Sequence, residues 1–195
     1  MVVTDVRKEL ARDLEEQFAV VRTHADWPDP WPDRQVPDEA YSRVTEPERW
    51  LIGRDRGEAW ARALVTVGLA ARSDEAEGIR LVPGAPGALT MLLVPHPAAL
   101  EVRAGDPPVA ALEVDCYCDA CDSGSSDFLR EIDDAVWHVI EGGFVRIDLG
   151  GAAITTHRDG WSSSGVLGHG ETERLIADAR VGRSRYPVVS GTAWW

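Results

Sequence analysis

The stretch Asp115-Cys116-Tyr117-Cys118-Asp119-Ala120-Cys121-Asp122 contains all three cysteines of the 195-residue chain. It lies at the end of residues 109–117, where apolar and polar residues alternate as in a strand. It precedes residues 125–141, where apolar residues recur at helical spacing. The segment is therefore expected to form a strand-to-helix junction in the middle of the fold.

The helix after the cysteines has the clearest pattern in the chain. Ser125 or Ser126 is expected to cap its first turn, and Gly142-Gly143 supplies the left-handed residue that commonly ends a helix. His138 falls on the charged side and is expected to face solvent. The apolar stripe that should be buried consists of Phe128, Leu129, Ile132, Val136, Val139 and Ile140.

Five segments predict strands. Residues 89–94 and 100–103 precede the strand at 109–117, and their short links suit hairpins and leave no room for crossover helices. Residues 144–149 and 152–157 flank Gly150-Gly151, which suits a two-residue turn. In that hairpin Ile147 should face Ile154. Residues 161–168 are expected to be a loop, followed by a helix over 171–181 and an extended, docked end over 186–195.

The N-terminal part predicts helices on either side of an irregular arm. Residues 4–22 form an amphipathic helix, and the prolines and tryptophans of residues 23–39 favour an arm. Thr45 and Glu48 have the spacing of a capping box, so a helix should begin there. We expect it to break at Gly53 or Gly57 and to continue to Ala71.

Together these elements predict an α+β fold, in which an antiparallel sheet of about five strands packs against several helices. The length fits a single domain over residues 1–195, with residues 23–39 as a Pro/Trp-rich arm.

The composition is strongly acidic. Asp and Glu number 33 against 20 Lys and Arg, which gives a net charge of −13. Such a surface repels nucleic acid and anionic membranes and suits a basic protein partner. The first residues are charged and no apolar run approaches membrane-spanning length, so a cytoplasmic protein is expected.

The cysteine cluster leaves three interpretations open. Cys116, Cys118 and Cys121 can converge on zinc, with Asp119 as the preferred fourth ligand and Asp115, Asp122 or a distant histidine as alternatives. Four nearby carboxylates would favour a bound cation. Alternatively, Cys118 and Cys121 form a redox pair before a helix, although the same carboxylates disfavour a thiolate. In the third interpretation the cysteines only pack, with Cys116 on the buried face of the strand.

Four other residues are candidates for binding. Trp27 and Trp31 lie on the arm, where tryptophans more often hold such an arm to its own domain than contact a partner. Arg43 and Arg49 follow the arm and complete the set of candidate binding residues.

Several motifs together resemble an actinobacterial family catalogued as domain of unknown function 6226. The resemblance covers about residues 39–60 and 89–146, and the string Cys-x-Cys-Asp-Ala-Cys-Asp is its most specific part. It implies a cytoplasmic bacterial protein and no activity. Members of the family usually have a small residue where this chain has Tyr117, and this departure argues against close backbone packing at that position. The motifs are Tyr41-Ser42-Arg43-Val44-Thr45-Glu46-Pro47-Glu48-Arg49, Leu89-Thr90-Met91, Val102-Arg103-Ala104-Gly105, and the cysteine string before a helix that ends at Gly142-Gly143-Phe144.

The sequence does not reveal an activity. The leading hypothesis is a non-enzymatic cytoplasmic binding or accessory protein with a structural zinc site at the cysteines. The alternative is a thiol-dependent redox protein or enzyme that uses Cys118 and Cys121.

Overall fold

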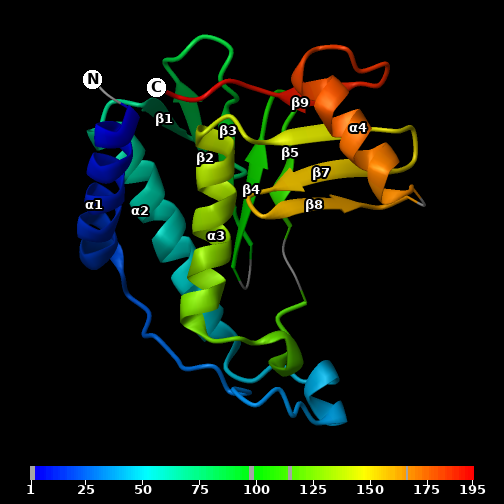
Figure 1. Cartoon of the computed structure of the whole chain (residues 1–195). Coiled ribbons are helices and arrows are strands. Elements are labelled where there is room, and N and C mark those ends of the chain that lie inside the picture. Colours follow the sequence, from blue (N-terminus) through cyan, green and yellow to red (C-terminus); the bar gives the residue numbers. More distant parts are fainter. Residues whose placement is uncertain (1–2, 97–98, 114–115, 166) are drawn as a thin grey trace.

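The computed structural model describes residues 3–96, 99–113, 116–165 and 167–195, which form an α+β fold with two antiparallel sheets (Figure 1). The helices are α1 (Val3–Val21), α2 (Ile52–Thr66), α3 (Ser125–Ile140) and α4 (His169–Arg180). Short 3-10 helices are η1 (Asp38–Ser42), η2 (Pro47–Leu51) and η3 (Asp119–Cys121). None of the described helices combines the length and apolar character that crossing a membrane requires. The predicted fold class is confirmed.

The first sheet has the order β1-β2-β3-β4-β5, so each strand pairs with its neighbour in sequence. Helices α2 and α3 pack on it, and α1 packs on α2. The three strands expected here are confirmed as β3 to β5, but β5 ends at Leu112 and Asp115 lies outside the described residues. The strands are β1 (Ala70–Asp74), β2 (Ile79–Pro83), β3 (Met91–Pro95), β4 (Leu100–Ala104) and β5 (Val109–Leu112).

The prediction for α2 was wrong at both glycines and at its end. The helix runs through Gly53 and Gly57 without a break. A Cβ on Gly57 would lie 2.8 Å from Leu100 Cδ2, so this glycine permits close contact between helix and sheet. The helix stops at Thr66 because Gly68 takes a left-handed conformation, with a φ of 77°, and the chain then enters β1.

Both predicted N-terminal caps were also wrong. Glu46, with a φ of 51°, precedes η2, and Thr45 bonds to Asp119 instead of capping a helix. Gly124 precedes α3, and the Ser125 hydroxyl donates to the Trp27 carbonyl. The two hydroxyls therefore fasten distant segments together.

The second sheet has the order β8-β7-β6-β9, and α4 covers one of its faces. The hairpin register is confirmed, since Ile147 pairs with Ile154. The loop expected over 161–168 was wrong in its first part, where β8 forms, and Val166 lies outside the described residues. Trp194 is buried in the main apolar cluster, as expected for a docked end. The strands are β6 (Val145–Asp148), β7 (Ala153–His157), β8 (Gly160–Ser163) and β9 (Val188–Ser190).

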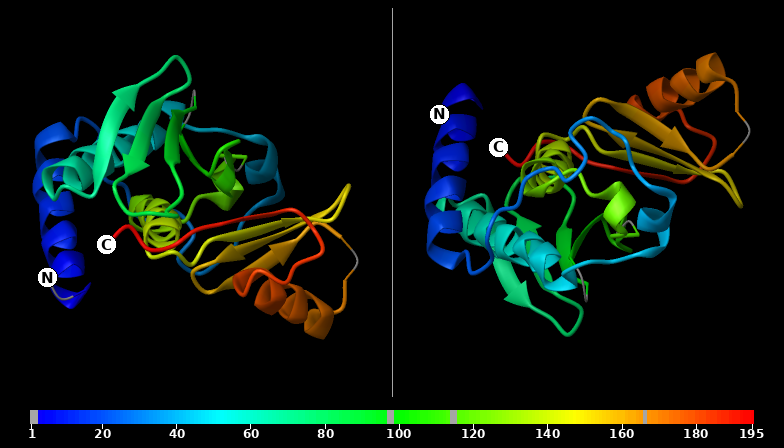
Figure 2. Two further views of the ribbon diagram at one scale, coloured as in Figure 1. Left: turned by 90° about the horizontal axis from the view of Figure 1, so that it is seen from above. Right: turned by 90° about the horizontal axis from the view of Figure 1, so that it is seen from below.

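The two sheets lie on either side of α3, with α1 and α4 at opposite edges of the molecule (Figure 2). One apolar cluster lies between the first three helices and the first sheet, and a smaller one lies under α4. The arm, residues 23–39, leaves α1 and passes below α3 towards η1 (Figure 1).

His138 connects α3 to the second sheet, so the prediction that it faces solvent was wrong. Its Nε2 lies 2.9 Å from Thr156 Oγ1, and the side chain is partly buried. Burial, together with the positive charges of His157, Arg180 and Arg158, lowers the pKa of His138 from 6.5 to about 4. The imidazole is therefore neutral in the folded protein at neutral pH.

We predict that His138 makes the folded state sensitive to mild acid. The unfolded chain takes up a proton at this residue near pH 6.5 and the folded chain only near pH 4. The stability of the protein should therefore fall as the pH drops through this window. His138→Gln should flatten that part of the profile in urea unfolding curves, and the exposed His169→Gln should leave it unchanged. Parallel profiles for the protein and His138→Gln would contradict the prediction.

Candidate metal site at the cysteine junction

The three sulfurs come together in the junction, which we define as residues 116–124. Cys116 Sγ lies 3.2 Å from Cys118 Sγ and 3.2 Å from Cys121 Sγ. All three sulfurs lie within 4.8 Å of one another, and they form the one group of three candidate metal ligands found among the described residues. The spacing Cys-x-Cys-x2-Cys thus produces the convergence that the metal hypothesis requires.

Local backbone conformation produces this convergence. Tyr117 has a φ of 50°, in the left-handed region, and this turn lies between Cys116 and Cys118. The 3-10 helix η3 then turns the chain so that Cys121 returns to the same point. At position 117, where the family resemblance implies a small residue, the Tyr117 ring packs against Trp50 with the ring centroids 5.2 Å apart. Cys116 is exposed and lies beyond β5, so its predicted place on a buried strand face was wrong.

The sulfurs influence one another's ionisation. A hydrogen bond from Cys116 lowers the pKa of the Cys118 thiol. Hydrogen bonds with Cys116 and Cys118 raise the pKa of Cys121 to about 12. Once one thiolate has formed, the cluster therefore resists a second negative charge. A bound cation would relieve that resistance, because metal ligands must be thiolates.

Asp119, the preferred fourth ligand, has its carboxylate directed at the segment after η1. It accepts hydrogen bonds from Arg43 Nε at 2.5 Å, from the Thr45 amide at 2.6 Å and from the Thr45 hydroxyl at 2.7 Å. These bonds lower the pKa of Asp119 from 3.8 to about 2, against the effect of burial. Both carboxylate oxygens are thus already bonded within the protein.

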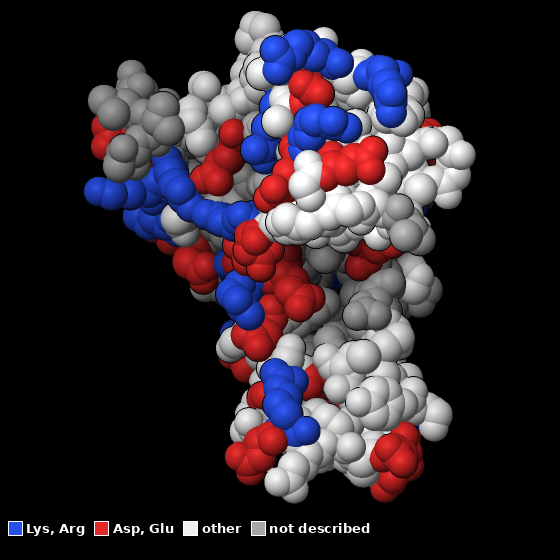
Figure 3. Space-filling view, turned by 45° about the vertical axis from the view of Figure 1, so that its right-hand side comes forward, with Lys and Arg blue, Asp and Glu red and all other residues white. Residues whose placement is uncertain are grey.

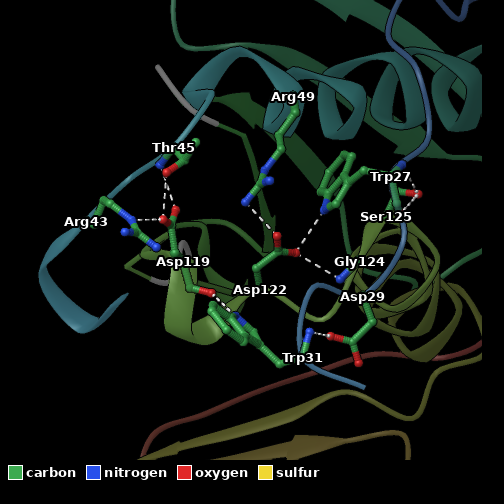
Figure 4. Close-up of polar contacts among 10 residues, drawn as sticks. All are labelled: Trp27, Asp29, Trp31, Arg43, Thr45, Arg49, Asp119, Asp122, Gly124 and Ser125. Carbon is green, nitrogen blue, oxygen red and sulfur yellow. Dashed lines mark hydrogen bonds and ion pairs between the residues drawn. The ribbon is translucent and has the colours of Figure 1, made fainter. Parts of the chain in front are cut away.

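Asp122 is fully buried and organises the other side of the junction (Figure 4). Its Oδ1 accepts hydrogen bonds from Trp27 Nε1 at 2.9 Å and from the Gly124 amide at 2.8 Å. Arg49 Nη2 lies 2.6 Å from Oδ2 as an ion pair without hydrogen-bond geometry. The Arg49 guanidinium also lies over the rings of Trp27 and Trp50, at 5.3 and 5.4 Å.

The arm is fastened by its two tryptophans, as expected for the more frequent of their two roles. Trp27 bonds to Asp122, and Trp31 Nε1 donates to the Asp119 carbonyl at 2.7 Å. Gly124 fits here only without a side chain, because a Cβ would lie 2.6 Å from the Asp29 amide nitrogen. All four candidate binding residues thus contact the junction: Trp27, Trp31, Arg43 and Arg49. The sequence did not indicate these contacts, because the residues lie far from the junction along the chain.

The charge at the junction differs from the expectation. Asp119 and Asp122 were thought to favour a cation, but Arg43 and Arg49 neutralise them. Asp115 lies outside the described residues. The attraction of this site for a metal therefore rests on the three sulfurs rather than on the described carboxylates.

Sequence reasoning missed the partners of these carboxylates. It interpreted Thr45 as a helix cap, and it had no signal that Asp122 would be the buried centre of the contacts from Trp27 and Arg49. One clue was available. Arg43, Thr45 and Arg49 lie in one short motif, and that motif and the cysteine string both carry the resemblance to the family.

We predict that Asp122→Asn destabilises the fold by about 3 kcal/mol, because it leaves Arg49 without its counter-charge in a buried position. Urea unfolding monitored by tryptophan fluorescence measures the loss. The matched control is Asp127→Asn, which removes an exposed ion pair with Arg130 and should cost less than about 0.5 kcal/mol. Equally small losses of unfolding free energy in both variants would contradict the prediction, because they would show that the buried ion pair contributes no more than the exposed one.

The comparisons with known proteins place the chain in a family. Searches of curated proteins and of solved structures found no match. The family model described as "Family of unknown function (DUF6226)" matches residues 14–195, which include the arm, the junction and both sheets. The family expected from the sequence motifs is thereby confirmed. The chain belongs to the DUF6226 family.

Proposed function

We propose that the chain binds one zinc ion through Cys116, Cys118 and Cys121, and that the ion stabilises a non-enzymatic, cytoplasmic binding or accessory protein. The observation that carries the proposal is the convergence of the three sulfurs within 4.8 Å. Thiolates are ligands that zinc prefers over the oxygen ligands of calcium or magnesium.

The geometry needs little adjustment to hold the ion. Zinc–sulfur bonds of about 2.3 Å in a tetrahedral site separate the sulfurs by about 3.8 Å. Two sulfur pairs lie at 3.2 Å, so metal binding requires them to move apart by roughly half an ångström. Because Asp119 is bonded to Arg43 and Thr45, we assign the three sulfurs alone as the protein ligands.

A structural role suits this part of the fold because it has little apolar core. In the described residues of the arm and junction, Trp27 and Tyr117 are the side chains that pack against the main apolar cluster. Polar contacts provide the remaining attachment. A metal bound by Cys116 and Cys121 would cross-link the two sides of η3 and stabilise the surface on which the arm lies.

We predict that the reduced protein binds one equivalent of zinc and becomes more stable as a result. At a free zinc concentration 100 times the dissociation constant, the gain in unfolding free energy should be about 2.7 kcal/mol. Cobalt substitution, followed by the sulfur-to-cobalt absorption, reports the ligand type. Cys118→Ser should weaken binding strongly, while Ser126→Ala, an exposed change on α3, should leave it unchanged. Metal-free protein whose stability ignores zinc would contradict the proposal.

The alternative function is thiol redox chemistry, which two observations favour. The pKa of Cys118 is lowered, and its sulfur and that of Cys121, the other half of the expected redox pair, lie within 4.8 Å of each other. Against it, Cys118 is only 6% exposed, so a substrate has little access to this thiol. Thiol titration before and after chelation distinguishes the two functions: zinc with three masked thiols supports the metal site, and one fast thiol without metal supports redox chemistry.

The acidic charge suits a basic protein partner. Acidic and basic side chains alternate on the face shown in Figure 3, so the net charge of −13 acts as a long-range field rather than as one patch on this face. Most arginines in the described residues form ion pairs with carboxylates of the chain, for example Arg56, Arg72 and Arg103, so the excess carboxylates stay available for a partner.

We predict that association with a basic probe depends on salt. An oligo-arginine peptide should associate more slowly as sodium chloride rises from about 50 to 300 mM, because the field is screened within a Debye length. Stopped-flow fluorescence measures the rate, and an oligo-glutamate peptide of equal length serves as the control and should not bind. A salt-independent rate would contradict steering by net charge.

A further inference from the structure

A second candidate site lies away from the cysteines, between the first sheet and the second. A hollow of about 270 Å³ has β5 as one wall and β6, β7 and β8 as the other. A neighbouring hollow of about 260 Å³ shares Ala111, Leu112 and His157 with it and extends towards α3. The two hollows adjoin along β5, which is the last strand of its sheet, and we call them together the cleft. Its lining also includes carboxylates, Glu113 in the first hollow and Glu131, Asp134 and Asp159 in the second.

The wall formed by the second sheet is polar, since α4 covers the opposite, apolar face. Arg146, Thr155 and Ser162 are direct neighbours across three strands and form a row on the cleft side. His157 and Ser164 lie beside this row and line the same hollow. The polar wall of the cleft is thus built by the strand register and not by mobile loops.

Arg146 is distinguished by what it lacks. Among the buried or half-buried arginines, it is the one for which no carboxylate of a described residue lies within 4 Å, although Glu113 lines the same hollow. The other six each form an ion pair. The paired residues are Arg22, Arg49, Arg56, Arg72, Arg80 and Arg103. The hydrogen bond that Arg146 makes is to Thr155 Oγ1, at 2.9 Å. A guanidinium withdrawn from water and left uncompensated is costly, and an anionic ligand would remove that cost.

The neighbouring hydroxyls have protons available for such a ligand. Thr155 Oγ1 accepts from Arg146, and Ser164 Oγ accepts from the Ala153 amide at 2.8 Å, so each can still donate. Ser162 Oγ lies 2.9 Å from His157 Nε2, and within this pair one proton also stays available. Thr155 is 8% exposed, which places its hydroxyl deep in the cleft.

We propose that the cleft binds a small organic carboxylate, with Arg146 paired to the carboxylate group and its short apolar body against Ala110, Ala111 and Leu112. The planar guanidinium matches the two oxygens of a carboxylate. The net charge of −13 works against every additional negative charge, so a singly charged carboxylate is favoured over a phosphate group. This site shares no residue with the zinc site, and either proposal can fail without the other.

The test is a titration of the ¹⁵N-labelled protein with acetate, butyrate and inorganic phosphate at constant ionic strength, followed by NMR. Acetate should shift the Arg146 Nε–H signal saturably, and butyrate should bind several-fold more tightly because its added methylenes contact the apolar wall. Arg146→Gln should weaken binding by at least about tenfold, since it removes a charge-assisted hydrogen bond. Arg174→Gln, an exposed arginine on α4, should bind as the unaltered protein does.

Three outcomes would overturn the proposal. They are the absence of saturable shifts, equal binding by the protein and Arg146→Gln, and binding of phosphate without the carboxylates. Circular dichroism checks that Arg146→Gln is folded. If the folded variant binds the carboxylates as well as the unaltered protein does, Arg146 is not the residue that holds the ligand.

Discussion

Two buried carboxylates, Asp119 and Asp122, determine how the N-terminal third of the chain meets the middle. A carboxylate removed from water needs several donors or a counter-charge. Each of these two obtains an arginine counter-charge and at least one donor from residues before α2. The path of the arm follows from that requirement, since Trp27, Arg43 and Arg49 must all reach the junction. The three sulfurs are held close together on the same turn.

The same pairing of arginine with carboxylate recurs over much of the molecule. Arg56, for example, is 5% exposed and contacts both Glu15 and Asp133. A chain with more carboxylates than basic side chains can provide an ion-pair partner for nearly every arginine that it partly buries. Against this background Arg146 is informative, because no carboxylate of a described residue lies within 4 Å of it and Glu113, in the same hollow, forms no ion pair with it. An external anion is the simplest complement.

The elements that could be predicted are those fixed by local periodicity. The stripe of α3 and the hairpin around Gly150 each depend on a few neighbouring residues. The hairpin formed as expected, and so did the stripe except for Leu129, which is half-buried. The helix break predicted at Gly57 was wrong because the role of this glycine is set by Leu100, on a strand more than forty residues away. The helix cap predicted at Thr45 was wrong because a hydroxyl that can cap a helix can also bond to a carboxylate from another segment. The convergence of the cysteines was foreseeable from spacing, whereas the neutralisation of the nearby aspartates was not, since it depends on tertiary contacts.

The contacts of the junction join residues far apart in the chain, and this bears on the order of folding. The bond between Arg43 and Asp119 spans 76 residues, and that between Trp27 and Asp122 spans 95. Closing such loops early is entropically costly, so we expect α2 and the first sheet to form first and to bring the ends near. In that order the cysteines would converge late in folding. A metal ion bound by the cysteines would then stabilise a nearly complete fold rather than nucleate folding.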